Sequence, residues 1–305
     1  MFVFLARRVF LAPTTWVYLL PNVVRYFLFI YSFRIHQNIL FSILLAKHLS
    51  LCYHNVIMIA NFRDLGGIPC GNNRVVKKGL LYRSATIDYA TNEELDEYKK
   101  LGIKVAYDFR EKGETKGDRA YDYIGAEHRN VPASYKNDKL FKLKGGGMLG
   151  MVFREVTWED VAPTYEHLPL NNKAYKAMMQ SLVDEEVPLM VNCSAGKDRA
   201  GIATTLILLL LGADYDTVLE EYMRSKDAQF FNEWVIGKII PKFAHKYVFS
   251  HFHAFFMVYK ELLDTSLNKI NETYESYDEY FLKEYGITPE IRAQLIERYT
   301  EVVEG

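Results

Sequence analysis

The pattern of apolar and polar residues between positions 91 and 193 shows the same order of elements twice, a helix followed by a short strand. Thr91 and Glu94 form a capping-box pattern, apolar residues then recur at helical spacing, and Gly102 provides a stop, so a helix of about three turns is expected. The run IKVAYDF that follows is β-branched and aromatic and too short for a helix. It predicts a buried strand that ends at Asp108.

The second copy of this order begins at Asn171 and Asn172, which provide the cap of another helix. The apolar face of that helix consists of Tyr175, Met178, Met179 and Leu182. The segment VPLMVN then predicts a strand that ends at Cys193. Helix-then-strand units build parallel sheets with helices on their faces, so the expected fold class is α/β, with a parallel sheet covered by helices on both faces.

The sequence after Arg199 predicts a helical C-terminal part. The run AGIATTLILLLLG predicts a buried helix that stops at Gly212, and an aspartate cap opens the next helix, DYDTVLEEYMRS. Three further amphipathic segments, AFFMVYKELLD, ESYDEYFLKEYG and TPEIRAQLIERYTEVV, complete one domain over residues 58–305. Residues 134–161 have weak periodicity and three consecutive glycines, which fits either a mobile lid over a site or an ordinary surface insertion.

Residues 1–57 form an N-terminal extension that differs from the rest. They are aromatic and aliphatic, but proline, asparagine and arginine interrupt them, and no stretch reaches the roughly 18 uncharged apolar residues of a membrane span. Three interpretations stay open: translated non-coding sequence before a physiological start at Met58, a membrane-associating segment, or a signal peptide. The first predicts a cytoplasmic protein, and the other two predict a membrane-associated or secreted one.

Charge and cysteine content narrow the possible functions. Residues 1–57 carry five basic residues and no acidic one, which leaves 32 basic against 38 acidic residues in the rest and a net charge of about −6 there. A body of this sign does not favour nucleic acid as a partner, so an anionic substrate needs a local positive site. The cysteines at 52, 70 and 193 form no CxxC motif, which argues against a disulfide framework and against a metal site. No cofactor is expected.

The segment VNCSAGKDRAG places Cys193 between a predicted strand end and a helix N-terminus, where open α/β sheets bind ligands. The amides from Ser194 to Arg199 can turn inward around a phosphate dianion, and the small Ala195 and Gly196 permit this tight curl. The same positive field favours the thiolate, which is the nucleophilic form of cysteine. Arg199 can hold two phosphate oxygens. The alternative is a small buried cysteine beside a solvated Lys-Asp-Arg run.

The loop CSAGKDRAG resembles the phosphate loop of cysteine-based protein tyrosine phosphatases. Together with NFRDLGG, GLLYRSA and YDFRE, it resembles the bacterial tyrosine phosphatase family that includes the secreted Listeria and mycobacterial enzymes, over residues 58–305. This resemblance implies Cys193 as nucleophile and Arg199 as phosphate clamp, with Lys197 and Asp198 contacting substrate or catalytic water. The implied substrate is a phosphotyrosine protein, and Lys197 is also similar to the pattern of phosphatases that accept phosphoinositides.

The general acid that protonates the leaving group is expected to be Asp108, from its place at a strand end and from similarity to the family's D-L-R segment. Asp198 is the rival, because it already lies in the loop. A third interpretation gives Asp108 a structural role as a partner of Arg110 or Arg83.

Two positions depart from the family pattern. Asn192 replaces the usual histidine before the cysteine, and Ala200 replaces the frequent threonine or serine after the arginine. Both departures are expected to slow turnover without changing the chemistry. Arg63 and Asp64, in NFRDLGG, are expected to stabilise the fold rather than to contact substrate.

Two other classes of function compete with a phosphatase. Rhodanese-like sulfur transfer and arsenate reduction also use a loop cysteine, but the Lys-Asp-Arg run favours phosphate over persulfide, and no resolving cysteine pair is evident for a reductase. A non-catalytic, phosphate-binding pseudophosphatase is suggested by Asn192 and Ala200, while the presence of Cys193 and Arg199 argues against it.

Overall fold

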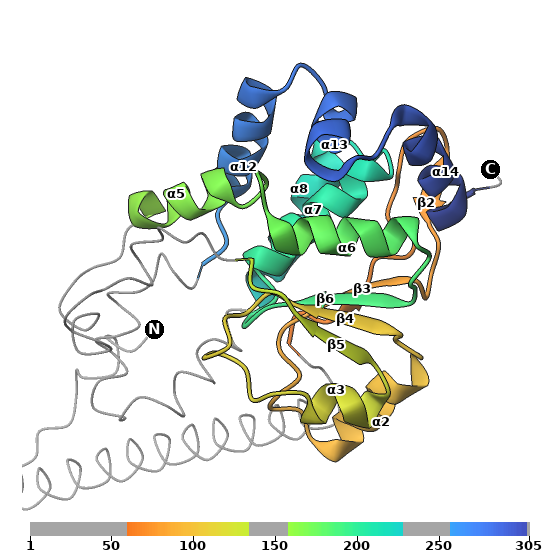
Figure 1. Ribbon diagram of the computed structural model, residues 1–305, viewed down its shortest axis with the longest axis vertical. Coiled ribbons are helices and arrows are strands. Elements are labelled where there is room, and N and C mark those ends of the chain that lie inside the picture. Colours follow the sequence, from red (N-terminus) through yellow and green to blue (C-terminus); the bar gives the residue numbers. More distant parts are fainter. Residues whose placement is uncertain (1–59, 134–157, 228–256, 304–305) are drawn as a thin grey trace, which may run out of the picture. The chain divides into compact units, whose positions relative to one another are not determined.

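The computed structural model of the chain describes residues 60–133, 158–227 and 257–303 (Figure 1). The predicted extension 1–57 and most of the loop predicted over residues 134–161 lie outside the described residues. The end of that loop is instead the first turn of helix α5 (Trp158–His167).

A five-stranded sheet forms the centre of the described domain, with strand order β1-β3-β6-β4-β5. Its four neighbouring parallel strands are β3 (Leu81–Ser84), β6 (Leu189–Asn192), β4 (Val105–Asp108) and β5 (Glu127–Asn130). The short strand β1 (Arg63–Asp64) is antiparallel to β3 at one edge. This topology confirms the predicted α/β fold with a parallel sheet.

Helices cover both faces of the sheet (Figure 1). Alternate strand residues point to opposite faces, and the core divides accordingly: Val105, Tyr107 and Val191 belong to one apolar cluster, whereas Ala106 and Met190 belong to another. The smaller cluster is completed by α2 (Asn92–Lys100) and α3 (Arg119–Ile124). The larger cluster is completed by α5, α6 (Lys173–Val183), α7 (Arg199–Leu210), α8 (Tyr215–Met223) and the C-terminal helices.

The helix caps read from the sequence are present. Thr91 accepts a hydrogen bond from the Glu94 amide, and the Glu94 carboxylate accepts one from the Thr91 amide, which completes the predicted capping box of α2. Asn172 caps α6 through the Ala174 amide. Asp214 accepts from the amide of Thr217 at the start of α8, as the predicted aspartate cap requires.

The C-terminal part is helical but does not end as predicted. After the 3-10 turn η1 (Arg224–Asp227), the described helices are α12 (Lys260–Thr273), α13 (Tyr277–Tyr285) and α14 (Pro289–Tyr299). The segment predicted to be helical through TEVV instead forms strand β7 (Thr300–Val302), antiparallel to β2 (Arg74–Val76). The β-branched Thr300 ends the helix and accepts a hydrogen bond of 2.6 Å from Nε of Arg74.

Candidate active site

The carboxyl ends of the four parallel strands meet at one edge of the sheet. The strand register places Asn192 of β6 opposite Ser84 of β3 and opposite Asp108 of β4, and Asp108 lies opposite Asn130 of β5. Cys193 follows β6 directly, and α7 begins at Arg199. The predicted order of strand, cysteine loop and helix is therefore present; residues 193–199 are called the cysteine loop below.

The outer side of the cysteine loop is held by hydrogen bonds to its backbone carbonyl groups. The four acceptors are the carbonyls of Ser194 (from the Thr86 amide, 3.2 Å), Ala195 (from Nδ2 of Asn61, 3.0 Å), Gly196 (from Nε of Arg83, 2.8 Å) and Lys197 (from Nη2 of Arg83, 3.2 Å). In a trans peptide the next N–H points away from the carbonyl. The N–H groups of residues 195–198 are therefore expected to point to the inner side of the loop, where they can form a nest for an anion beside the N-terminus of α7.

Two arginines and one glutamate anchor this arrangement. Arg83 has no exposed surface, and besides the loop carbonyls it binds Ser225 Oγ at 2.6 Å and Glu221 Oε1 at 3.3 Å. Nε of Arg63 binds the same Glu221 oxygen at 2.7 Å. Burial, together with the neighbouring positive charge of Arg83, lowers the pKa of Arg63 to about 10. Asp64 accepts hydrogen bonds from the amides of residues 66 and 79, so both residues of the NFRDLGG motif have structural partners, as expected.

Gly196 is required by the shape of the loop. Its φ angle is +68°, and a Cβ atom there would lie 2.4 Å from the Ser84 carbonyl oxygen and 2.7 Å from the Ala85 nitrogen. Both neighbours are backbone atoms of the β3 end, which cannot move aside as a flexible side chain can. The close approach of strand and loop therefore depends on glycine at this position.

Cys193 and Arg199 are brought together by the fold. Cys193 is 2% exposed and belongs to the larger core cluster. Nη1 and Nη2 of Arg199 bind Oε2 and Oε1 of Glu114 at 2.7 and 2.9 Å. Burial alone would lower the pKa of Arg199, but the hydrogen bonds to Glu114 outweigh it, Cys193 acts in the same direction, and together they raise that pKa, so the guanidinium stays charged.

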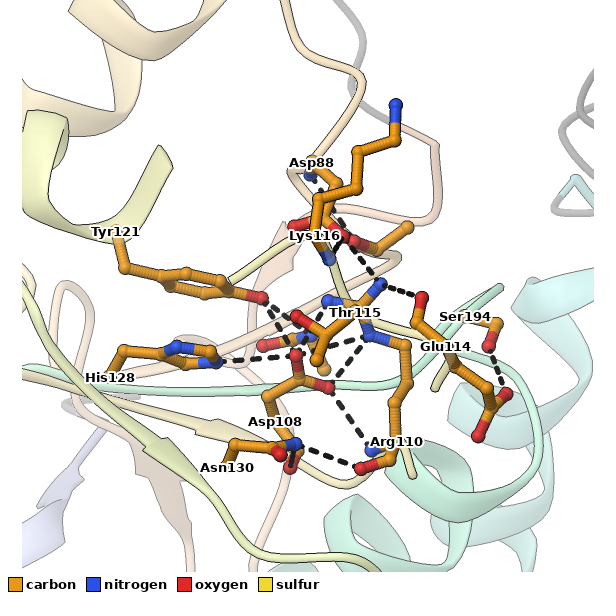
Figure 2. A network of polar contacts seen from close by, with 12 residues as sticks. Asp88, Asp108, Arg110, Glu114, Thr115, Lys116, Tyr121, His128, Asn130 and Ser194 are labelled. Atoms are coloured by element: carbon orange, nitrogen blue, oxygen red, sulfur yellow. Dashed lines mark hydrogen bonds and ion pairs between the residues drawn. The ribbon is translucent and has the colours of Figure 1, made fainter. Parts of the chain in front are cut away.

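Glu114 is a site residue that no pattern in the sequence singles out. It lies in the polar segment EKGET after β4, which has no apolar periodicity and no recognisable motif. Besides Arg199, its Oε1 accepts a hydrogen bond of 2.9 Å from Oγ of Ser194 (Figure 2).

Lys197 and Asp198 lie together at the end of the loop. Nζ of Lys197 donates to Oδ1 of Asp198 at 2.7 Å and to the Met257 carbonyl at 3.3 Å. Oδ1 of Asp198 also accepts a hydrogen bond from the Tyr165 hydroxyl. Although Asp198 occupies the N-cap position of α7, its carboxylate does not cap the helix, and its side chain remains 27% exposed.

Asp108, the predicted general acid, is instead the centre of a buried ionic network (Figure 2). Its carboxylate accepts hydrogen bonds from Arg110 Nε at 2.9 Å, Arg110 Nη2 at 2.6 Å and Tyr121 at 3.3 Å, and it lies 3.2 Å from Nε2 of His128. Burial alone would raise the pKa of Asp108, but the hydrogen bonds from His128 and Arg110 outweigh it and lower the pKa to about 2. A carboxyl group ionised in this way has no proton to donate at neutral pH. These contacts argue for the structural alternative, with Arg110 as the partner.

The two departures from the family pattern have different surroundings. Nδ2 of Asn192 donates to the Tyr121 hydroxyl at 3.0 Å, which joins the strand before Cys193 to the Asp108 network, while its buried Oδ1 has no hydrogen-bond partner among the described residues. Ala200 has no exposed surface and packs in the larger core cluster.

Within the described ranges, no three His, Cys, Asp or Glu side chains are grouped so as to hold a metal ion. None of the helices in those ranges is long and apolar enough to cross a membrane.

Comparison with known proteins defines the class of this chain. Residues 54–301 match the Tyrosine phosphatase family, and the chain belongs to that family. An inferred tyrosine-protein phosphatase of Cupriavidus necator is 28% identical over 231 residues, which cover 73% of this chain and 80% of that protein. The triple specificity protein phosphatase PtpB of Mycobacterium tuberculosis is 35% identical over 189 residues, which cover 55% of this chain and 67% of PtpB.

Among solved structures, the Siw14 catalytic core is 15% identical, with a TM-score of 0.29, and the match covers 65% of this chain and 95% of that one. The Pseudomonas aeruginosa protein TpbA, in a cysteine-to-serine variant with phosphotyrosine, is 16% identical with a TM-score of 0.27, over 67% and 94% of the two chains. The predicted phosphatase class and the mycobacterial resemblance are confirmed by the family and sequence relatives. The resemblance to the Listeria enzymes stays a prediction.

Proposed function

We propose that this protein is a phosphomonoester hydrolase that works through a phosphocysteine at Cys193. The observation that carries the proposal is the anchoring of four successive carbonyls, those of residues 194–197, from the outer side of a loop that begins at Cys193 and ends at Arg199. This anchoring leaves the amides of residues 195–198 for the inner side of the loop. Such a ring of donors, with a guanidinium at its end, complements the oxygens of a phosphoryl group in the ground state and as charge develops during transfer.

The reaction has two displacements. In the first, the Cys193 thiolate attacks phosphorus, the ester P–O bond breaks, and the departing oxygen takes a proton. In the second, water attacks the phosphocysteine, the S–P bond breaks, and the thiolate and inorganic phosphate are released. Arg199 binds phosphoryl oxygens through both steps.

Asp198 is the proposed proton donor of the first step and proton acceptor of the second. Its side chain is partly exposed at the end of the loop, and only Oδ1 is engaged by Lys197 and Tyr165 in the described contacts, so Oδ2 is positioned to exchange a proton with a leaving group or with water. Asp108 cannot fill this role while Arg110 and His128 hold it ionised.

The proposed substrates are phosphotyrosine proteins, with phosphoinositides as a second class. Family membership supports the first. The lysine at position 197, which resembles the pattern of lipid-accepting phosphatases, supports the second, and the relative PtpB carries the name triple specificity phosphatase. Hydrolysis of a phosphotyrosine peptide and of a short-chain phosphoinositide, each compared between wild type and Lys197→Met, tests this division: the variant should lose more activity on the phosphoinositide.

The mechanism is tested by Cys193→Ser, assayed with a chromogenic aryl phosphate with and without a chelator. We expect hydrolysis to fall by a factor on the order of 10³ or more, while inorganic phosphate still binds, because the amides and Arg199 remain. The matched control is Cys70→Ser: Cys70 is also buried, lies near Gly212 beyond the other end of α7, and has its pKa raised to about 11 by burial.

Three outcomes would contradict the proposal. Turnover of Cys193→Ser near the wild-type rate would exclude a thiolate mechanism. Phosphate binding without hydrolysis by the wild type would indicate a pseudophosphatase. Sulfur transfer from thiosulfate to cyanide would indicate a rhodanese-like activity.

A further inference from the structure

Glu114 binds the guanidinium of Arg199 end-on. Oε2 lies 2.7 Å from Nη1 and Oε1 lies 2.9 Å from Nη2, so each carboxylate oxygen takes one terminal nitrogen. The same two nitrogens also donate to the Phe109 carbonyl at 3.3 Å and to Oγ of Ser194 at 3.2 Å. Among the described residues, Nη1 and Nη2 donate all the hydrogen bonds of this guanidinium. Its Nε donates none of them.

The planar guanidinium of an arginine can bind an oxyanion in two ways: through Nη1 and Nη2 at its end, or through Nε and one Nη along its side. A carboxylate fixed at the end sets the plane of the guanidinium and leaves the Nε side as the edge for a phosphoryl group. Glu114 also accepts a hydrogen bond from Ser194, the first residue after the cysteine (Figure 2). One carboxylate therefore touches both ends of the cysteine loop, at Ser194 and at Arg199.

Glu114 is itself held in place by hydrogen bonds to Glu111 and Arg110. Its Oε2 accepts a hydrogen bond of 2.8 Å from the Glu111 amide, and its own amide donates to the Glu111 carbonyl at 2.8 Å. Its carbonyl oxygen accepts from Nη1 of Arg110 at 3.0 Å (Figure 2). Arg110 is fixed in turn by Asp108 and by Asp88, whose Oδ2 lies 2.8 Å away. The buried network thus connects to the loop through Glu114.

The charge state of Glu114 agrees with this geometry. Partial burial alone would raise its pKa, but the hydrogen bonds and positive charge of Arg199 outweigh burial and lower that pKa. The side chains of Glu114 and Arg199 are 27% and 11% exposed.

We propose that Glu114 is a positioning residue, which orients Arg199 and Ser194 so that the cysteine loop can bind an oxyanion. This inference rests on the proposed function, since the oxyanion is the phosphoryl group of the substrate. The opposing interpretation is that the Glu114 carboxylate occupies the place of the phosphate and competes with it. The two interpretations predict opposite signs for the effect of removing the negative charge.

The test is calorimetric titration of the full chain with inorganic phosphate, for the wild type and Glu114→Gln. A glutamine can accept from only one terminal nitrogen of Arg199, and its NH₂ group faces the other donor. Positioning predicts phosphate binding weaker by about 10- to 100-fold, the effect of losing a charge-assisted pair, although a negative charge has been removed. Competition predicts tighter binding, and equal or tighter binding in the variant overturns the proposal.

The matched control is Glu111→Gln, which removes the same charge from the same segment. Glu111 is exposed and contributes only its backbone groups to this arrangement, so phosphate affinity should stay within about twofold of the wild type. If Glu111→Gln weakened phosphate binding as much as Glu114→Gln does, the effect would come from the loss of any negative charge in this segment, and the proposal would be overturned.

A second variant covers the case in which Glu114→Gln does not fold. Glu114→Asp keeps the charge but is one methylene shorter, so it cannot bridge Nη1 and Nη2 as Glu114 does. Positioning predicts weaker phosphate binding for this variant, and unchanged or tighter binding overturns the proposal.

The dependence on Arg199 is tested in an Arg199→Lys background. There Glu114→Gln should weaken phosphate binding by much less than it does beside Arg199, because the fork that Glu114 orients is absent and only its contact with Ser194 is lost. A full additional loss would show that Glu114 acts independently of Arg199 and would overturn the proposal. Hydrolysis of an aryl phosphate, measured in parallel, separates the two proposals: a wild type that binds phosphate but does not hydrolyse the ester contradicts the proposed function alone.

Discussion

The replacement of Asp108 by asparagine distinguishes a structural carboxylate from a general acid. Asparagine keeps the size of the side chain and removes the negative charge that Arg110, His128 and Tyr121 contact. Arg110 keeps its second partner, Asp88. The variant should therefore fold, with lower stability.

The magnitude follows from the pKa of Asp108, which is lowered from its ordinary value of 3.8 to about 2. At 1.36 kcal/mol for each pH unit, the ionised carboxylate stabilises the folded state by about 2.5 kcal/mol. We expect the free energy of unfolding of Asp108→Asn to be lower by this amount at pH 5–6.

The pH dependence has a definite sign. Because the folded-state pKa of Asp108 is lowered, its contribution is complete above about pH 4 and is lost as the pH falls toward 2. The pKa of His128 is raised: burial opposes this, but the hydrogen bonds to Asp108 and Asp118 outweigh it. The contribution of the imidazolium is therefore complete below its unfolded-state pKa of about 6.5 and is lost as the pH rises through the folded-state value. The difference between wild type and variant should thus be largest between about pH 4 and 6.5 and shrink on both sides.

Urea denaturation across this pH range, followed by circular dichroism, measures the effect. Asp118→Asn is the matched control, because Asp118 binds the same imidazole but is 67% exposed, so its loss should cost less than about 1 kcal/mol. The structural role also predicts equal losses of turnover on alkyl and activated aryl phosphates. Unchanged stability, with a loss confined to alkyl phosphates, would refute this reasoning and restore Asp108 as the general acid.

Two further substitutions test the cysteine loop. Gly196→Ala should lower hydrolysis and phosphate affinity by at least about 100-fold, because its Cβ would lie 2.4 Å from the Ser84 oxygen. The control is Gly125→Ala, which also has a positive φ, +79°, but no atom of the described residues near its Cβ. It measures the cost of backbone strain alone, about 1–2 kcal/mol. Normal phosphate affinity in Gly196→Ala would show that the loop does not need this close contact. Asp198→Asn should slow alkyl phosphates more than activated aryl phosphates, whose leaving groups need little protonation; equal losses on both would remove Asp198 as proton donor.

Much of the fold could be predicted because its signals are local. The caps at Thr91, Asn172 and Asp214 and the apolar runs before Asp108 and Cys193 lie within a few residues of the elements they define. Strands β1, β2, β3, β5 and β7 were not predicted. They are short, and their sequences, RD, RVV, LYRS, EHRN and TEV, have no run of alternating apolar residues. Pairing of β2 with β7 joins residues near the two ends of the described domain, which no local pattern records.

The site shows the same division. The cysteine and the arginine are placed by the local order of strand, loop and helix. The surroundings of Asp108 could not be predicted from its strand end, because its contacts with Tyr121 and His128 come from two elements that later pack beside it. Nothing in the sequence around Glu114 indicates its place in the site, because its partner Arg199 lies 85 positions further along the chain and is brought to it only by the fold.

Because the cysteine loop is held from its outer side, the hydrophobic core can form correctly while the loop itself is misshaped. Arg83 reaches the loop carbonyls only while Glu221 and Ser225, 138 and 142 positions further along the chain, hold its guanidinium. Glu221 and Ser225, at the α8–η1 junction, thus support the curvature of the loop through Arg83, which binds its carbonyls. Natural variation at this junction can therefore abolish activity in a chain that keeps an intact sheet, and such a loss would be misread as a folding defect or a changed specificity if only the loop sequence were compared.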